Sequence, residues 1–141
     1  ALIPDCLKSI LKNQNFIPRG NGNNIRDFIY VEDVAELYLS MAKKLYLKPK
    51  KITGQVFNAG AKKPIKVREI IKTIFKLENK LKQFKKINKL FKFKKTSGEI
   101  DFQYMDYKKV YKYFGWKPKT NFNSGISKTI YWYKKNISKI L

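Results

Sequence analysis

The fold is decided by the stretch IRDFIYVEDVA, which occupies residues 25–35. Its middle part, residues 27–31, is rich in aromatic and β-branched residues and predicts a short strand. Asp33 and Glu36 stand three positions apart, the spacing of a capping box, and predict that Asp33 caps the start of a helix. The apolar stripe expected on this helix consists of Val34, Leu37, Tyr38, Met41 and Leu45. A strand followed directly by a capped helix indicates an α/β protein.

Elements of the same two kinds are predicted on both sides of this stretch. Helices are expected over residues 2–12, 67–77, 107–114 and 122–137, strands over 55–60 and 100–105, and a basic loop over 46–54. Asp106 and Asn121 are expected to cap the last two helices, and Gly115 is expected to end the first of them. Three short strands without evident partners indicate a piece of a larger α/β protein. Residues 1–141 are therefore expected to form a single partial domain.

Residues 78–95 differ from the rest because lysines alternate there with leucine, isoleucine and phenylalanine. This pattern fits either an amphipathic helix or a poorly ordered insertion. We treat the segment as a variable Lys-rich insertion in the expected domain.

The composition excludes several classes of function. The chain has 141 residues, 43% of them hydrophobic and 15% aromatic, which is the composition of a globular domain. It has one cysteine, Cys6, and no histidine, so disulfides within the chain and histidine-based catalysis or metal binding are excluded. There is neither a run of 18 apolar residues nor a visible secretory signal, and we expect a cytoplasmic protein without metal or membrane contacts.

The charge is strongly positive, with 32 Lys and Arg against 10 Asp and Glu, a net charge of +22. A polyanionic partner would explain it. A compositional drift toward Lys, Asn and Ile codons would explain it equally well. The drift explanation fits the near absence of arginine, since only Arg19, Arg26 and Arg68 are arginines and specific phosphate recognition favours the planar arginine fork.

Several segments, taken in order, resemble one known family. They are residues 25–35, Val56–Gly60, Gly98–Asp106, Phe114–Pro118 and Gly125–Tyr133. Together they resemble the C-terminal half of the extended short-chain dehydrogenases, the NAD-dependent nucleotide-sugar epimerases and dehydratases. The resemblance implies the C-terminal substrate-binding part of a Rossmann-type NAD(P)-binding enzyme, here without its N-terminal dinucleotide-binding half.

The resemblance assigns substrate contacts to individual residues. Arg26 would bind the diphosphate of a nucleotide sugar, as a guanidinium fork can; the alternative is a surface arginine paired with Glu32 or Asp33. Asn58 would approach the nucleotide, or would only satisfy a turn. The residues expected to lie along the base, or to be ordinary edge packing, are Phe16, Ile17 and Arg19.

One position departs from the pattern of the family. Many relatives carry a second phosphate-binding arginine two residues before a Gly-acid pair, and the corresponding residue here is Thr96, before Gly98-Glu99. Lys95 or its neighbour Lys94 would replace the arginine as a point charge without the fork geometry. Glu99 would bind a ribose hydroxyl or organise the loop.

The sequence contains neither of the two catalytic signatures of that family. No glycine-rich turn that could bind a dinucleotide pyrophosphate is present. Tyr104 and Lys108 match the spacing of the catalytic Tyr–Lys pair, but they fall at a strand-to-helix junction and not in the catalytic helix. We therefore assign no catalytic residue. The resemblance implies NAD or NADP in the complete enzyme, none bound by this chain alone, an N-terminal half as partner, and a homodimer.

The function that follows is part of an NAD-dependent nucleotide-sugar 4,6-dehydratase, most similar to those acting on CDP-glucose or GDP-mannose, with this chain alone inactive. A UDP-glucose 4-epimerase is the first alternative. A basic module that binds nucleic acid or a membrane surface, supported by residues 78–95, is the second, although a nucleic-acid partner is not expected.

Overall fold

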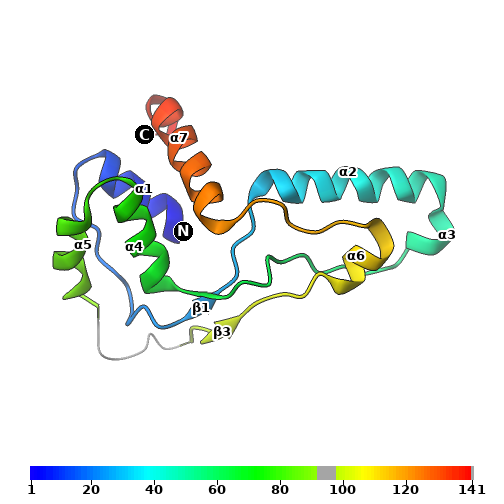
Figure 1. Ribbon diagram of the computed structural model, residues 1–141, viewed down its shortest axis with the longest axis horizontal. Helices are drawn as coiled ribbons and strands as arrows, with labels where there is room; N and C mark the ends of the chain where they lie inside the picture. Colours follow the sequence, from blue (N-terminus) through cyan, green and yellow to red (C-terminus); the bar gives the residue numbers. More distant parts are fainter. Residues whose placement is uncertain (92–97, 141) are drawn as a thin grey trace. The chain divides into compact units, whose positions relative to one another are not determined.

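The structure is a computed structural model that describes residues 1–91 and 98–140. It divides into two compact units, each assembled from separate stretches of chain (Figure 1). Unit 1 comprises Ala1–Arg26, Ile65–Phe102 and Ile126–Leu141, and unit 2 comprises Asp27–Pro64 and Gln103–Gly125. The elements are α/β, as the sequence predicts.

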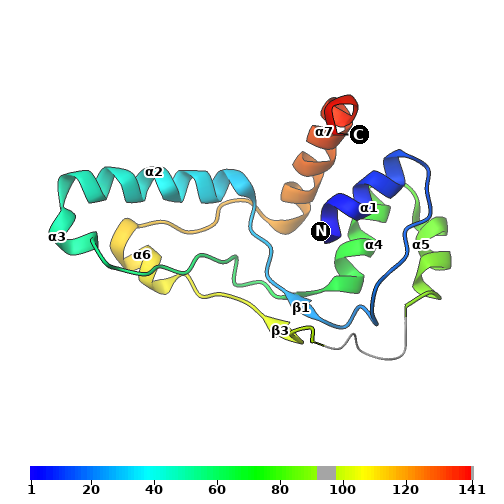
Figure 2. The ribbon, with the colours of Figure 1, turned by 180° about the vertical axis from the view of Figure 1, so that it is seen from behind.

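Unit 1 is built on a layer of helices. Helix α1 (Leu2–Leu11) and helix α5 (Leu81–Asn88) both pack against α4 (Val67–Leu77), and the three lie side by side in both ribbon views (Figure 2). Each buries residues at helical spacing, and together they bury Cys6, Leu7, Ile10, Ile70, Ile71, Ile74, Phe75, Phe84 and Ile87. The helices predicted over 2–12 and 67–77 are confirmed.

Cys6 belongs to this core and is completely buried. Burial disfavours the charged thiolate and raises the pKa of the Cys6 thiol to about 12. The thiol is therefore a small apolar core group, and it is unsuited to act as a nucleophile at neutral pH.

A small sheet lies beside these helices. Strand β1 (Ile25–Arg26) pairs antiparallel with β2 (Ile65–Lys66), so that Arg26 lies opposite Ile65. Strand β3 (Phe102–Gln103) completes the sheet in the order β2-β1-β3. The backbone N–H of Ile25 also donates to the carbonyl of Asp101 at 2.7 Å, so the chain just before β3 is tied to β1.

The predicted strands were too long or displaced. Strand structure is found at 25–26 and not at 27–31, and it covers only 102–103 of the predicted 100–105. Residues 55–60, all of them described, are extended but form no strand. Side-chain composition alone does not make a strand, because a strand requires a neighbour that satisfies its backbone hydrogen bonds.

Unit 2 packs helix α2 (Val31–Leu47) and helix α6 (Lys108–Phe114) around a core of Leu37, Val110 and Trp116. Phe57 and Ala59 pack against this core, and the ring of Phe57 meets that of Phe114 edge to face at 4.9 Å between centroids. The loop predicted over 46–54 is largely helical, because α2 extends through residue 47 and helix α3 (Pro49–Ile52) follows it.

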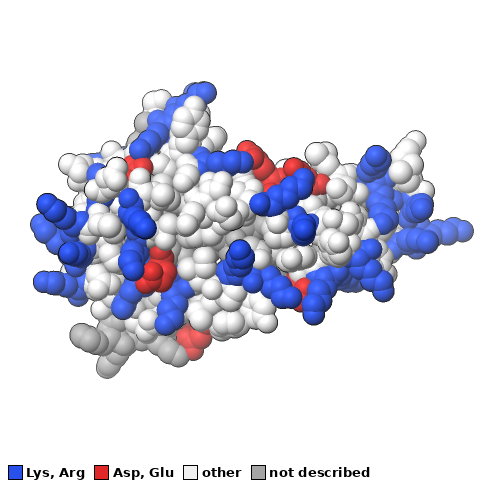
Figure 3. All heavy atoms as spheres, in the orientation of Figure 1, with Lys and Arg blue, Asp and Glu red and all other residues white. Residues whose placement is uncertain are grey.

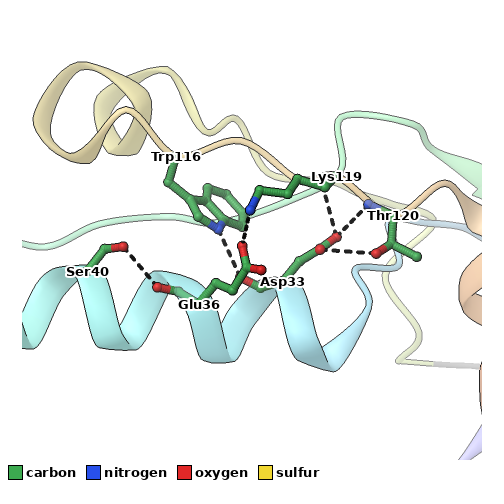
Figure 4. Close-up of polar contacts among 6 residues, drawn as sticks. All are labelled: Asp33, Glu36, Ser40, Trp116, Lys119 and Thr120. Carbon is green, nitrogen blue, oxygen red and sulfur yellow. Dashed lines mark hydrogen bonds and ion pairs between the residues drawn. The ribbon is translucent and has the colours of Figure 1, made fainter.

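Helix α2 begins earlier than predicted. Its N-cap is Tyr30 and not Asp33, which lies in the first turn and is only 4% exposed. The Asp33 carboxylate does not cap its own helix, because it accepts hydrogen bonds from the backbone N–H of Lys119 at 3.2 Å and from the backbone and hydroxyl of Thr120 at 2.9 and 3.1 Å (Figure 4). The Asp33 carbonyl accepts a fourth bond, from the indole N–H of Trp116 at 2.9 Å.

The predictions for Gly115 and Asn121 are confirmed, but the N-cap of α6 is Tyr107 and not Asp106. Asp106 accepts from the backbone N–H of Lys108 at 2.6 Å at the start of α6, and Gly115 ends that helix in the left-handed conformation. Asn121 accepts from the N–H of Ser124 at 2.9 Å at the start of α7 (Phe122–Ile140). In the Lys-rich segment 78–95, α5 forms a helix with Phe84 and Ile87 buried, while residues 92–95 lie outside the described residues.

Replacing Asp33 by alanine is expected to destabilise unit 2 by about 3 kcal/mol, since three donors lose a buried charged acceptor. Urea unfolding followed by tryptophan fluorescence measures this change. The matched control is Glu36→Ala, which removes the exposed ion pair with Lys119 and should leave the unfolding free energy nearly unchanged, because solvent screens that pair. Equal effects of the two substitutions would contradict the structural role of Asp33.

Candidate functional site

Arg26 is partly buried at the end of β1. Its Nη1 donates to the neighbouring carbonyl of Ile25 at 2.8 Å, which uses one of its five N–H donors. The carboxylate of Asp33, one of the partners considered for Arg26, is engaged by Lys119 and Thr120. Among the described residues, the Arg26 side chain makes no further hydrogen bond or ion pair.

The three residues expected along the base, Phe16, Ile17 and Arg19, all lie in unit 1 but differ in their surroundings. Phe16 is 8% exposed and belongs to the core, whereas Ile17 is 71% exposed. The guanidinium of Arg19 is exposed and lies 3.7 Å from the carboxylate of Asp5 on α1. Ile17 and Arg19 are therefore the accessible members of this group.

The loop between these residues and Arg26 is held from two sides. On one side, its carbonyls at Gly22 and Asn24 accept from the backbone N–H groups of Arg68 and Val67, each at 2.9 Å. On the other side, the Asn24 amide donates to the carbonyl of Ile100 at 3.2 Å. The loop is thereby fixed between the start of α4 and the chain that leads into β3.

Glu99 lies in the same unit and is exposed. Lys95, proposed to stand in for the missing arginine, lies outside the described residues, as does Thr96. Of the two substrate contacts expected in this region, the structure therefore describes Glu99 and not Lys95.

Asn58 belongs to unit 2, where it is exposed on the extended segment that follows α3. Two residues later, Gly60 is buried against Asp27, whose carboxylate accepts from the backbone N–H groups of Lys62 at 3.0 Å and Lys63 at 3.3 Å. The sequence does not predict this role of Asp27, and the one available signal is its place directly after Arg26 in the family motif.

The Tyr104–Lys108 pair shows no catalytic arrangement. Tyr104 is 48% exposed, and the ammonium of Lys108 lies 3.8 Å from the carboxylate of Asp106. Within the described ranges, no cluster of histidine, cysteine or acidic residues could hold a metal ion, and no helix is long and apolar enough to cross a membrane.

Positive charge does not mark the site by itself. Figure 3 shows lysine and arginine side chains spread over the visible face of both units, with few acidic ones among them. The candidate site is distinguished instead by Arg26, a partly buried arginine on a strand. The loop that precedes Arg26 is held by hydrogen bonds on both sides.

Comparison with known proteins identifies the family. Residues 1–129 match the family profile described as GDP-mannose 4,6 dehydratase. The chain belongs to this family. A dTDP-glucose 4,6-dehydratase of Escherichia coli is 30% identical over 144 residues, which are 96% of this chain and 37% of that protein. A putative UDP-glucose 4-epimerase of Methanocaldococcus jannaschii is 32% identical over 136 residues, 96% of this chain and 40% of that protein.

The fold agrees with this family. A crystal structure of dTDP-glucose 4,6-dehydratase from Bacillus anthracis in complex with NAD matches with a TM-score of 0.76 and 27% identity, over 98% of this chain and 40% of that one. The chain thus spans about two fifths of the length of the family members that it matches. Its relatives are NAD-dependent nucleotide-sugar dehydratases and epimerases with a Rossmann-type fold.

Gly60 is expected not to tolerate a side chain. A Cβ at this position would lie 2.5 Å from the Asp27 carboxylate and 2.6 Å from the carbonyl of Met105. Gly60→Ala should therefore destabilise unit 2 by about 2 kcal/mol, measured by urea unfolding. Gly125→Ala is the control, because its Cβ would meet nothing nearer than 3.5 Å and should be neutral or stabilising.

Proposed function

We propose that this chain is the C-terminal, substrate-binding part of an NAD-dependent nucleotide-sugar 4,6-dehydratase. The observation that carries the proposal is the family match over residues 1–129 in a chain that spans about two fifths of its relatives. On this proposal residues 1–141 act as one substrate-binding lobe. The sugar substrate would be a hexose linked to a nucleoside diphosphate.

The residues of unit 1 supply the means of binding such a substrate. Arg26 offers a charged fork to the diphosphate, while Ile17 and Arg19 offer an apolar side chain and a stacking guanidinium to the base. We assign Glu99 to a ribose hydroxyl and Lys95 to the diphosphate, where Lys95 would substitute for the absent arginine. Asn58, in unit 2, is assigned to the nucleotide. These assignments rest on the resemblance and on the exposure of each described side chain.

NAD supplies hydride transfer to and from the sugar in an enzyme of this kind. The residues of this chain do not fit a dinucleotide site, because the sequence holds no glycine-rich turn for the pyrophosphate. We therefore assign NAD binding and the catalytic tyrosine to the part of the enzyme that pairs with this chain, and we expect the chain alone to bind no NAD and to be inactive.

The surface of unit 2 supports such a pairing. Helix α2 has a second apolar face, formed by Val31, Ala35, Tyr38, Leu39, Ala42, Leu45 and Tyr46, all of them exposed. These positions recur at helical spacing and point away from the buried Leu37. The predicted single stripe was thus wrong for Tyr38 and Leu45, which are 68% and 44% exposed. A helix that is apolar on two faces is typical of one buried between two layers, and the second layer would be the dinucleotide-binding half.

A 4-epimerase is the alternative, which the family match does not favour, although the M. jannaschii relative is a putative UDP-glucose 4-epimerase. Product analysis of the complete enzyme separates the two, since a dehydratase yields a 4-keto-6-deoxy sugar and an epimerase yields the C4 epimer. The basic binding module is not favoured by the family match. We also propose that the complete enzyme is a homodimer, which light scattering would test.

Arg26→Gln is expected to weaken binding of a nucleoside diphosphate by about 10- to 100-fold, because a charge-assisted fork is lost. Isothermal titration of the chain with dTDP, UDP, GDP and CDP measures the affinities, and NAD titrated in the same way should give no signal. Lys66→Gln is the matched control, since Lys66 lies on β2 of the same sheet and carries the same charge. Equal losses for both variants would indicate unspecific attraction and overturn the assignment.

Leu39→Gln is expected to raise the solubility of the isolated chain without lowering its unfolding free energy, because Leu39 is 72% exposed on the second face of α2. Leu37→Ala, on the buried face of the same helix, should instead cost about 2–5 kcal/mol. The solubility limit and urea unfolding measure the two effects. A loss of stability in Leu39→Gln comparable to that of Leu37→Ala would contradict the open second face.

A further inference from the structure

Arg68 is a residue to which the sequence assigns no function, and its surroundings in unit 1 are unusual. It lies in the first turn of α4, and its guanidinium carbon is 4.6 Å from the centre of the Phe91 ring, within the range of a cation–π contact. Its Nη2 donates to the carbonyl of Asn21 at 3.0 Å, and its backbone N–H donates to the carbonyl of Gly22 at 2.9 Å. Arg68 therefore binds the loop of residues 20–24 through both its side chain and its backbone.

Gly22 of the loop packs closely against the side chains of Phe91 and Arg68. A Cβ on Gly22 would lie 2.5 Å from Cε1 of Phe91 and 3.1 Å from Cβ of Arg68, and Gly22 has a φ of +71°. The loop therefore touches both the aromatic ring and the arginine that stacks on it. Within the loop, the side chain of Asn21 accepts a hydrogen bond from the backbone N–H of Asn23 at 2.9 Å, which further restricts the loop.

The Nε–H of Arg68 is buried and has no hydrogen-bond partner among the described residues. Such a donor is unfavourable in itself, so this position has a cost that a flexible lysine would avoid. The chain nevertheless has an arginine here, one of only three beside its many lysines. A lysine could not stack a planar group on Phe91 and donate to Asn21 at the same time.

We propose that Arg68 is a positioning residue for nucleotide recognition. The loop of residues 20–24 connects the proposed base contacts, Ile17 and Arg19, to the proposed diphosphate ligand, Arg26. By clamping this loop, Arg68 sets the separation between the two subsites, so that a base and its diphosphate are bound together. The inference rests on the proposed function, because it concerns the same nucleoside diphosphate.

A ligand that occupies both subsites gains from their fixed separation, whereas a ligand of one subsite does not. Arg68→Lys, which keeps the charge, is therefore expected to weaken dTDP binding by about tenfold and to leave the affinity for inorganic pyrophosphate within about twofold. Isothermal titration of the 141-residue chain with each probe gives the ratio of its affinity for dTDP to its affinity for pyrophosphate. Lys72→Arg, an exposed exchange on the same helix, is the control and should leave both affinities unchanged.

Phe91→Leu provides a second variant, since it removes the stacking face but retains an apolar side chain, and it should lower the same ratio. Equal losses for dTDP and pyrophosphate in both variants would indicate a purely structural role and overturn the inference, as would unchanged binding of both probes. If the native chain binds neither probe, the proposed function itself fails. Circular dichroism of each variant separates these results from unfolding.

Discussion

The buried carboxylate of Asp33 is the interaction on which the structure of unit 2 depends. It lies in the first turn of α2 and accepts from backbone and side-chain donors of residues 119 and 120, which are 86 and 87 positions away. The same residue accepts the indole N–H of Trp116 through its carbonyl. Two distant stretches of chain are thus joined at one helix start, and the core around Leu37, Val110 and Trp116 forms beside this junction. A neighbouring contact, the exposed ion pair of Glu36 with Lys119 at 2.5 Å, raises the pKa of Lys119 but lies in solvent and adds little.

In unit 1 the comparable constraint is the fixed loop before Arg26. Its carbonyls are bound by the start of α4, and its side chains and neighbouring backbone are bound by residues 100 and 101. A loop of this composition, with two glycines and three asparagines in residues 20–24, would be flexible if it were free. The loop is ordered by its hydrogen bonds to the start of α4 and to residues 100 and 101. Rigid support of a loop is what a binding site for a two-part ligand requires, because the two contacts strengthen each other only when their separation is maintained.

Charge and hydrophobicity carry different information in this chain. Lysines and arginines are spread over the face seen in Figure 3, so the net charge of +22 raises attraction to any anion without marking a site. The exposed apolar face of α2 is more specific, because monomeric proteins rarely leave a continuous apolar surface of this kind on a helix. On the proposed function, this face would be the contact with the rest of a longer enzyme.

The sequence by itself determined the positions of α1, α4, α6 and α7, the caps at Gly115 and Asn121, and the family. These features depend on side-chain spacing and on hydrogen bonds between residues two to four positions apart, which are local and can be recognised without a partner. Only the tertiary structure decided that Asp33 binds residues 119 and 120 in place of its own helix, that strands form at 25–26 and 102–103, and that Arg68 stacks on Phe91. The same is true of Tyr38 and Leu45, whose helical spacing is compatible with either face of α2. Each of these outcomes depends on groups distant in the sequence, and contacts of that kind are set by packing and leave no periodic pattern that a single sequence could display.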